Sequence, residues 1–286
     1  MPSRRPERAI AVGVDLGGTW LRAVAVSLEG IRLRSFRARG PDPETLRGFL
    51  RGLWRRWRVT PTKVAALVVA TRGVWTASER RARERSLEGL ARRVRVVPDA
   101  QAAYLGALGP VAGLLVVAGT GSIVLGRTSR GRWLRRGGLG PLLGDEGSAF
   151  WIGREWLRAR MRGDDFRRVR RLIRAADGPA RIAGVAIQVL ARSRTGDKIA
   201  RRIVAQAQRH LATQAAEAAR ALALPPPVPV SWAGRLLDDP RFRAGVVREL
   251  RRRGLSVRSV PPREAPAETA ARLALRLARG QSRTAF

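Results

Sequence analysis

Two glycine-rich turns in this sequence have the residue types that bind phosphate. In "GVDLGGTW" a buried run ends at Asp15 and is followed by Gly17, Gly18 and Thr19. Glycines permit positive φ and let backbone N–H groups approach a phosphate, and a threonine hydroxyl is a further donor. A carboxylate such as Asp15 can bind hydrated Mg²⁺. The turn predicts a phosphate site, although an ordinary glycine hairpin is the alternative for this motif alone.

The second turn lies in "VVAGTGSIVLG", where Gly119, Thr120, Gly121 and Ser122 separate two apolar runs. Two hydroxyls and two glycines in four residues form a compact set of donors for a triphosphate. The spacing fits neither a Walker P-loop, which needs G-x-x-x-x-G-K-[ST], nor a protein-kinase loop. Those two classes of nucleotide site are therefore set aside.

Two further positions lie where predicted strands end. Asp99, in "VVPDAQAAYLGAL", opens a helix, so its carboxylate is either a helix N-cap or a general base. The spacing alone favours the cap. Gly234, in "VPVSWAGRLLDDPRF", could let an adenine lie against the backbone, which is a weak signal by itself.

Residues 137–155 read "GGLGPLLGDEGSAFWIGRE" and place Asp145 and Glu146 between glycines, with apolar residues beyond them. A solvated run of charge would not have this pattern, because such runs lie among other polar residues. The two carboxylates therefore need another explanation.

Composition excludes several classes of function. The net charge is +35, almost all of it from arginine, on segments that also have helical apolar spacing. We therefore expect solvated helix faces, and we expect no nucleic acid partner. The absence of cysteine removes disulfides, thiolate catalysis and cysteine-held clusters. The sequence has neither a long apolar run nor a signal-peptide core, so we expect a cytoplasmic enzyme with no membrane partner.

Hydrophobic periodicity predicts mixed α/β structure. Strands are predicted over 10–15, 20–28, 31–38, 63–71, 94–99, 113–119, 122–129, 132–138, 228–234 and 255–260. Helices are predicted over 44–57, near 78–93, from about 99, and over 147–161, 165–176, 179–192, 197–224, 240–253 and 266–279. A meander of three strands followed by helices recurs about 100 residues later. This recurrence predicts two similar α/β lobes with a cleft between them.

The order of these motifs resembles that of the actin-like sugar-kinase superfamily. Over about 13–243 the chain is similar to the BadF/BadG/BcrA/BcrD ATPase family, which includes N-acetylglucosamine kinases, most specifically at "GDEGSAFWIGRE". The resemblance implies two actin-like, ribonuclease H-like lobes, each a βββαβαβ core, with an interlobe nucleotide and substrate cleft. We expect one lobe over 1–102, with the segment 266–286 as a candidate to complete it, and the other over 103–265 with a helical insertion.

The resemblance also implies roles for individual residues. Asp99 would be the general base, and Asp15 would hold Mg²⁺ through water. The nucleotide would bind Asp15, Gly17, Gly18, Thr19, Gly119, Thr120, Gly121, Gly234 and Arg235. The acceptor would bind Ser122, Gly138, Leu139, Gly140, Asp145 and Glu146. The implied activity is ATP-dependent phosphorylation of a small-molecule amino sugar, with N-acetylglucosamine or glucosamine as the first acceptor to consider. Whether the protein forms a homodimer stays open.

Some stretches depart from the family. The segment "ARGPDPETL" lacks an asparagine that usually reaches a sugar hydroxyl, and "TRGVWTASERR" replaces small residues and an acidic turn. These departures leave the acceptor open. Two other classes of function stay open as well. One is a nucleotide-dependent regulatory ATPase of the BadF type without a sugar acceptor, and the other is a polyanion-binding protein that uses the positive charge.

Overall fold

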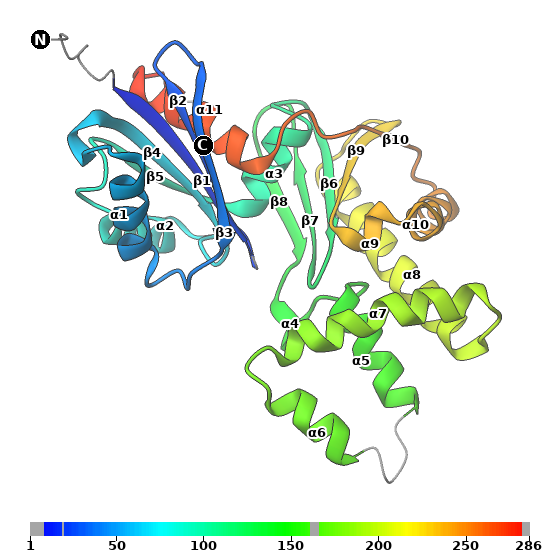
Figure 1. Cartoon of the computed structure of the whole chain (residues 1–286). Helices are drawn as coiled ribbons and strands as arrows, with labels where there is room; N and C mark the ends of the chain where they lie inside the picture. The colour runs from blue at the N-terminus through cyan, green and yellow to red at the C-terminus, as the bar shows by residue number, and fades with distance from the viewer. Residues whose placement is uncertain (1–8, 19, 161–165, 282–286) are drawn as a thin grey trace, which may run out of the picture. The chain divides into compact units, whose positions relative to one another are not determined.

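The computed structural model describes residues 9–18, 20–160 and 166–281. The chain divides into two compact units, one of residues 1–109 with 263–286 and the other of residues 110–262. Within the described residues each unit contains one five-stranded sheet with helices against it (Figure 1). The predicted α/β class is confirmed. The division falls after Gly109 and not inside the helix that begins at Asp99, so that helix lies wholly in the first unit.

The sheet of unit 1 has the order β3-β2-β1-β4-β5. Its strands are β1 (Ile10–Leu16), β2 (Trp20–Ser27), β3 (Arg32–Arg39), β4 (Val64–Thr71) and β5 (Val94–Pro98). The first three pair antiparallel, as the sequence predicts for a meander, and β4 and β5 add parallel to β1. The helices of unit 1 are α1 (Leu46–Trp57), the short η1 (Pro61–Lys63), α2 (Ala77–Ser86), α3 (Asp99–Ala107) and α11 (Pro266–Ala278).

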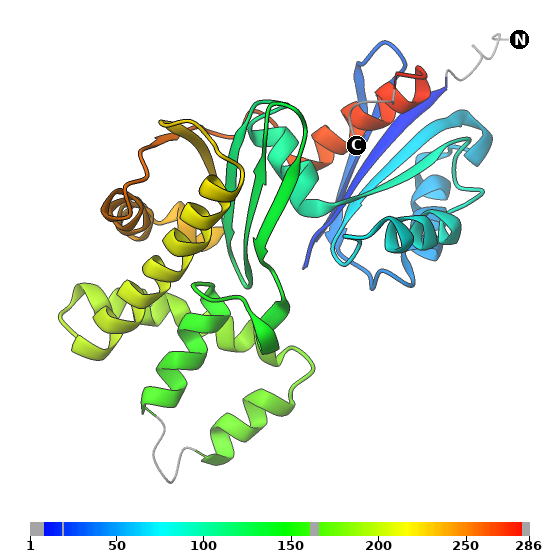
Figure 2. The same ribbon diagram turned by 180° about the vertical axis from the view of Figure 1, so that it is seen from behind.

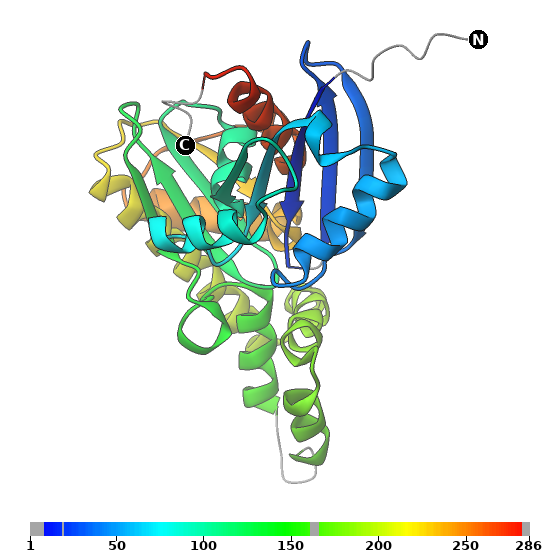
Figure 3. The same ribbon diagram turned by 90° about the vertical axis from the view of Figure 1, so that its left-hand side faces the viewer.

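The alternation of side chains along β1 gives this sheet two covered faces. Val12, Val14 and Leu16 belong to the apolar cluster that includes the buried face of α1. Ala11 belongs to the opposite cluster, which is built with α3 and α11. Figure 3 shows α1 and α11 on opposite sides of the sheet. The last helix of the chain therefore supplies part of the core of the unit that begins the chain.

The contact between α11 and β1 depends on Gly13. A Cβ atom at position 13 would lie 1.9 Å from the backbone nitrogen of Ala271 and 2.4 Å from the carbonyl carbon of Ala270. The helix backbone thus lies directly on the strand, at a separation that no side chain at position 13 permits.

Unit 2 repeats the same sheet order, β8-β7-β6-β9-β10. Its strands are β6 (Gly113–Ala118), β7 (Ser122–Arg127), β8 (Trp133–Gly137), β9 (Val228–Ala233) and β10 (Val257–Ser259). Its helices are α4 (Gly140–Leu143), α5 (Ala149–Arg160), α6 (Phe166–Arg174), α7 (Gly178–Arg194), α8 (Lys198–Ala221), α9 (Arg235–Asp238) and α10 (Pro240–Arg252). The first five of these helices form the connection between β8 and β9, in which α8 packs on the sheet and α4 to α7 are additional to the single α-helix that joins β3 to β4 in unit 1. Figure 2 shows this unit from behind.

The observed elements differ from the predicted ones mainly at their ends. The helix predicted near 78–93 ends at Ser86, because a turn with positive φ at Gly89 leads into β5. The strand predicted over 255–260 is only Val257–Ser259. The four-residue α4 was not predicted, because its sequence is short and lies among glycines. Among the described residues no helix is long and apolar enough to cross a bilayer.

Several arginines bind the carboxyl ends of helices that are distant in sequence. Arg47 donates to the Ser86 carbonyl at the end of α2 over 3.1 Å, and Arg132 donates to that of Ala221 at the end of α8 over 2.6 Å. Arg93 reaches the Leu277 carbonyl in α11 over 2.8 Å. The last carbonyls of a helix have no partner within it and carry partial negative charge, so a guanidinium is a suitable donor there.

We expect Gly13→Ala to destabilise unit 1 by about 1–3 kcal/mol or more, because the added methyl group would overpack the contact between β1 and α11. Thermal unfolding followed by tryptophan fluorescence measures the effect. Gly48→Ala is the matched control, since a Cβ atom there would have no neighbour within 4 Å on the exposed side of α1. That change should be neutral or stabilising by about 0.5–1 kcal/mol. Equal melting temperatures for the two variants would contradict the close contact.

Candidate active site

The parallel strands of unit 1 end in register. Leu16 of β1 pairs with Thr71 of β4, and Thr71 pairs with Pro98 of β5. The next residues along the three strands are Gly17, Arg72 and Asp99, which therefore begin the three connections at the same edge of the sheet. The carboxyl ends of parallel strands are where open α/β sheets place their ligands.

The turn after β1 has the form expected of a tight hairpin. The Gly17 N–H donates to the Trp20 carbonyl over 3.0 Å, and Gly18 is exposed. The neighbour of Gly18 is an arginine, because a Cβ atom at position 18 would lie 3.4 Å from Nη1 of Arg72. Thr19, predicted to bind phosphate, lies outside the described residues.

Asp15 and Asp99 lie close enough for their charges to interact. Burial raises the pKa of Asp15 from 3.8 to about 6, the Asp99 carboxylate adds to the rise, and Arg22 opposes it through an ion pair of 3.5 Å. Burial also raises the pKa of Asp99, whereas the Ala100 N–H, which donates to Asp99 Oδ1 over 2.8 Å, and the charge of Arg72 lower it. A general base works best when its pKa lies near the working pH, so a raised pKa makes a carboxylate better suited to that role near neutral pH. The helix begins at Asp99 itself, with Pro98 at the N-cap position and no side-chain cap hydrogen bond, so the prediction of Asp99 as the N-cap is wrong. Its role as a general base stays a prediction, with which the raised pKa is compatible.

Arg72 is the residue of this edge that the sequence did not assign. It is exposed, and it follows β4 directly, between the turn after β1 and Asp99. The available signal was its position after a predicted strand. In a chain with 57 lysines and arginines, one more arginine does not stand out.

In unit 2 the second glycine turn and the 137–155 segment contact each other. Asp145 Oδ1 accepts from the Ser122 N–H over 3.2 Å, and Ser122 Oγ donates to the Glu146 carbonyl over 2.9 Å. A Cβ atom on Gly121 would lie 2.8 Å from Asp145 Oδ2. Burial raises the pKa of Asp145, the Ser122 N–H lowers it, and Glu146 raises it. The predicted phosphate turn and the predicted acceptor carboxylate are thus in direct contact in this unit.

The turn is also held by the helix that follows the segment. The N–H groups of Ala149 and Phe150, in the first turn of α5, donate to the carbonyls of Gly119 and Thr120 over 2.9 and 3.1 Å. Thr120 itself has an exposed side chain, and its backbone is fixed by this contact. These hydrogen bonds explain why "AGTGS" and "GDEGSAF" occur together in the chain, because the start of α5 holds the backbone of the glycine turn in place.

The backbone between β8 and α5 turns repeatedly through left-handed conformations. Gly138, Gly140 and Gly147 have φ of 70°, 81° and 81°, and Asp145 has φ of 61°. Left-handed backbone is uncommon for a residue with a side chain, and Asp and Asn tolerate it best. Leu139, between two of these glycines, is 59% exposed. Asp145 is thus held in a sparsely populated conformation that aims its carboxylate at the Gly121–Ser122 backbone.

Gly234 lies against the same turn. Its φ is 93°, and a Cβ atom there would lie 2.4 Å from the Ala118 carbonyl oxygen and 2.9 Å from the Gly119 nitrogen. β6 and β9 are parallel neighbours, so Gly119 and Gly234 follow adjacent strand ends. Arg235 opens α9 with an exposed side chain. Within unit 2 the predicted nucleotide residues at 119–121 and 234 therefore come together.

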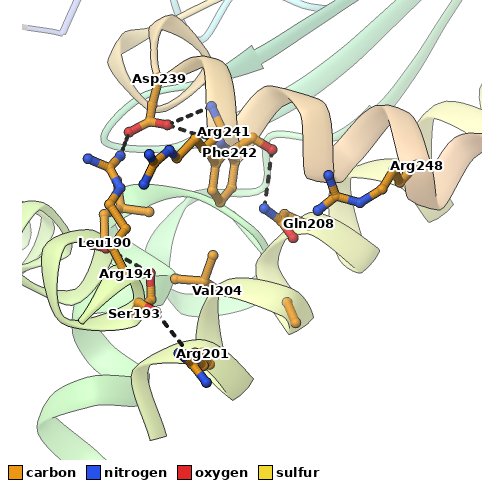
Figure 4. Close-up of a pocket in the computed structure, with 11 residues that line it drawn as sticks. Leu190, Ser193, Arg194, Arg201, Val204, Gln208, Asp239, Arg241, Phe242 and Arg248 are labelled. Carbon is orange, nitrogen blue, oxygen red and sulfur yellow. Dashed lines mark hydrogen bonds and ion pairs between the residues drawn. The ribbon is translucent and has the colours of Figure 1, made fainter. Parts of the chain in front are cut away.

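A pocket of about 210 Å³ in unit 2 lies among α7, α8 and α10 (Figure 4). Arg194 pairs there with Asp239, and Gln208 donates to the Phe242 carbonyl over 3.2 Å. None of the predicted site residues that the structure describes lines this pocket. The candidate site residues of each unit are therefore its glycine turn and carboxylates, and this pocket is not part of them.

The sequence pattern of the BadF/BadG/BcrA/BcrD ATPase family matches residues 12–274, which include both glycine turns, Asp99 and Asp145. This chain belongs to that family. A stretch of 75 residues is 41% identical to N-acetylmuramic acid/N-acetylglucosamine kinase of Clostridium acetobutylicum. The stretch spans 26% of this chain and 24% of the length of that relative.

Two solved structures of similar fold are related to this member of the family. The putative N-acetylglucosamine kinase from Chromobacterium violaceum has a TM-score of 0.72 and 24% identity, over 94% of this chain and 100% of that one. That from Porphyromonas gingivalis has a TM-score of 0.71 and 17% identity, over 92% and 97%. At these identities the likeness concerns the fold, and it agrees with the two α/β units that the structure shows.

The environment of Asp15 gives a pH-dependent prediction. A carboxylate with a folded pKa of about 6 holds its proton in the folded state between about pH 4 and pH 6, where the unfolded chain has lost it. Its contribution to stability therefore falls as the pH rises through this window. We expect Asp15→Asn, which cannot ionise, to gain stability relative to the parent protein by up to about 3 kcal/mol between about pH 4 and about pH 8.

Urea unfolding at a series of pH values, followed by tryptophan fluorescence, measures this difference. Asp238→Asn, which removes an exposed carboxylate from α9, is the control for the loss of one acidic side chain. A difference for Asp15→Asn that does not change with pH would contradict the raised pKa of Asp15.

Proposed function

We propose that this protein is an ATP-dependent kinase that transfers a phosphoryl group to a hydroxyl of an amino sugar, with N-acetylglucosamine or glucosamine as the first acceptor to test. The observation that carries the proposal is Asp99, a carboxylate with a raised pKa at the strand edge that also bears the Gly17–Gly18 turn. Family membership and the amino-sugar kinases named among the related proteins support the same activity.

The roles divide between the two units. In unit 1, the backbone of the Gly17–Gly18 turn would bind nucleotide phosphates, and Asp99 would accept the proton of the attacking hydroxyl. In unit 2, the turn over 119–122 would bind phosphate, Gly234 and Arg235 would flank adenosine, and Asp145 would accept hydrogen bonds from the acceptor. ATP supplies the phosphoryl group, whose bond to the leaving ADP oxygen breaks as the bond to the acceptor oxygen forms.

Mg²⁺ belongs to this proposal through Asp15. Among the residues that the structure describes, no group of three or more His, Cys, Asp or Glu could enclose a metal ion. Mg²⁺ does not need such a cage, because it is usually held by one or two carboxylates, water and substrate phosphates. A single buried carboxylate next to a glycine turn fits that mode of binding, and Arg22 would have to share Asp15 with the hydrated ion.

ADP release in the presence of a panel of amino sugars and hexoses, with a control without sugar, tests the activity. Release that depends on an amino sugar supports the kinase. Release that is the same without sugar would support the alternative, a nucleotide-dependent ATPase with no sugar acceptor.

We expect Asp99→Asn to reduce kcat by about 10²–10⁴-fold, because the amide cannot accept the hydroxyl proton. Its Oδ1 can still accept from the Ala100 N–H, so the start of α3 should be preserved. Steady-state kinetics measures the loss, and equilibrium titration should show ATP affinity within about twofold of the parent protein. Turnover close to that of the parent protein would remove Asp99 from the role of base.

Asp145→Asn is a cleaner test of the acceptor site than removal of the side chain. Asparagine tolerates the left-handed backbone and keeps an oxygen for the Ser122 N–H, so only the charge is lost. We expect the KM for the sugar to rise by about tenfold or more, as is typical when a hydrogen bond to a charged group is weakened. The KM for ATP should stay within about twofold. Equal increases in the two constants would instead indicate a structural role for Asp145 in the turn.

A further inference from the structure

Arg72 lies between two features of unit 1 that the proposed function uses, the Gly17–Gly18 turn and Asp99. Hydrogen bonding in register places Thr71 between Leu16 and Pro98, so Arg72 leaves the sheet edge between Gly17 and Asp99. All three positions belong to unit 1 and follow buried parallel strands, whose ends are fixed by the sheet.

The guanidinium of Arg72 extends toward the first of these neighbours. Its Nη1 lies 3.4 Å from the position that a Cβ atom of Gly18 would take. It therefore lies directly beside the turn whose backbone N–H groups are the expected phosphate donors. A Cβ atom at position 18 would be in ordinary van der Waals contact with this guanidinium, so the guanidinium and the turn are direct neighbours.

Arg72 forms no hydrogen bond or ion pair through its side chain with any residue that the structure describes. By contrast, Arg22 pairs with Asp15, and Arg80 donates to the Trp75 carbonyl over 2.8 Å. A guanidinium that lies beside a glycine turn and has no hydrogen bond or ion pair to the described residues is complementary to a phosphoryl group, which it can bind through two parallel N–H···O bonds.

We propose that Arg72 is a catalytic residue that binds the terminal phosphoryl group of the nucleotide at the Gly17–Gly18 turn and stabilises its negative charge during transfer. This inference rests on the proposed function. The charge of Arg72 also opposes the effect of burial on the pKa of Asp99, which is consistent with a guanidinium that reaches both groups.

Nucleotide binding tests the proposal without any acceptor. Arg72→Ala should bind a non-hydrolysable ATP analogue with Mg²⁺ at least about tenfold more weakly, because a charge-assisted contact to the terminal phosphate is lost. Its affinity for ADP should stay within about twofold. Arg72→Lys should recover part of the affinity, since it keeps the charge and loses the fork.

Arg81→Ala is the matched control, at an exposed position on α2 of the same unit. It should bind both nucleotides as the parent protein does. Unchanged discrimination between the ATP analogue and ADP in Arg72→Ala would overturn the proposal. Melting temperatures of the variants show whether any loss reflects folding, and Arg72, being exposed, should not affect the core.

Turnover supplies the second readout. With the best acceptor, Arg72→Ala should lose about 10²-fold or more in kcat with little change in the KM for the sugar, and added guanidinium ion should restore part of the rate. Unchanged kcat in Arg72→Ala would likewise reject the role in transfer. If the parent protein shows no sugar-dependent turnover, the proposed function fails, whereas the binding comparison still decides whether Arg72 holds the terminal phosphate.

Discussion

Hydrogen bonds between the parallel strands β1, β4 and β5 determine where the polar groups of unit 1 can act together. The pairing of Leu16 with Thr71 and of Thr71 with Pro98 brings three connections to one edge. A shift of one residue in any strand would move its end by about 3.3 Å and turn its side chains to the other face of the sheet. Unit 2 uses the same constraint, since its parallel strands β6 and β9 bring Gly119 and Gly234 together. The repeated sheet order thus places two sets of candidate site residues by one arrangement.

The sequence predicts this arrangement well where periodicity is strong. Buried strands such as β1 and β4 have nearly continuous apolar runs, which the sequence shows directly. Asp99 follows the shorter run of β5, and the sequence still predicts it at the end of a strand. The contact of Asp145 with Ser122 is different, because it joins residues 23 apart through a left-handed backbone. Neither the path of that loop nor the short α4 has a periodic signal in the sequence. The sequence therefore indicates that Asp145 and Glu146 are unusual, and the structure shows where the Asp145 carboxylate points.

The abundance of arginine makes an arginine at a binding site hard to recognise in this sequence. The arginine side chain is used at helix ends, as at Ser86 and Ala221, where neutral carbonyl oxygens accept from it. Arginines at these positions need no acidic partner, because they donate to backbone carbonyls instead of forming ion pairs. Against that background a functional arginine such as Arg72 is recognisable only from its neighbours, which the sequence does not show.

The path of the chain through unit 1 has a consequence for the order of folding. The chain leaves this unit at Gly109, builds all of unit 2, and returns at Arg263 to form α11. On the ribosome, every strand of unit 2 has been made before the helix that covers Ala11, Ala66 and Ala70 exists. Domains generally fold as they emerge, amino-terminal first. Here α3 covers only part of this apolar face, and the rest of it stays uncovered until α11 is synthesised, so the later unit is the first that can be complete.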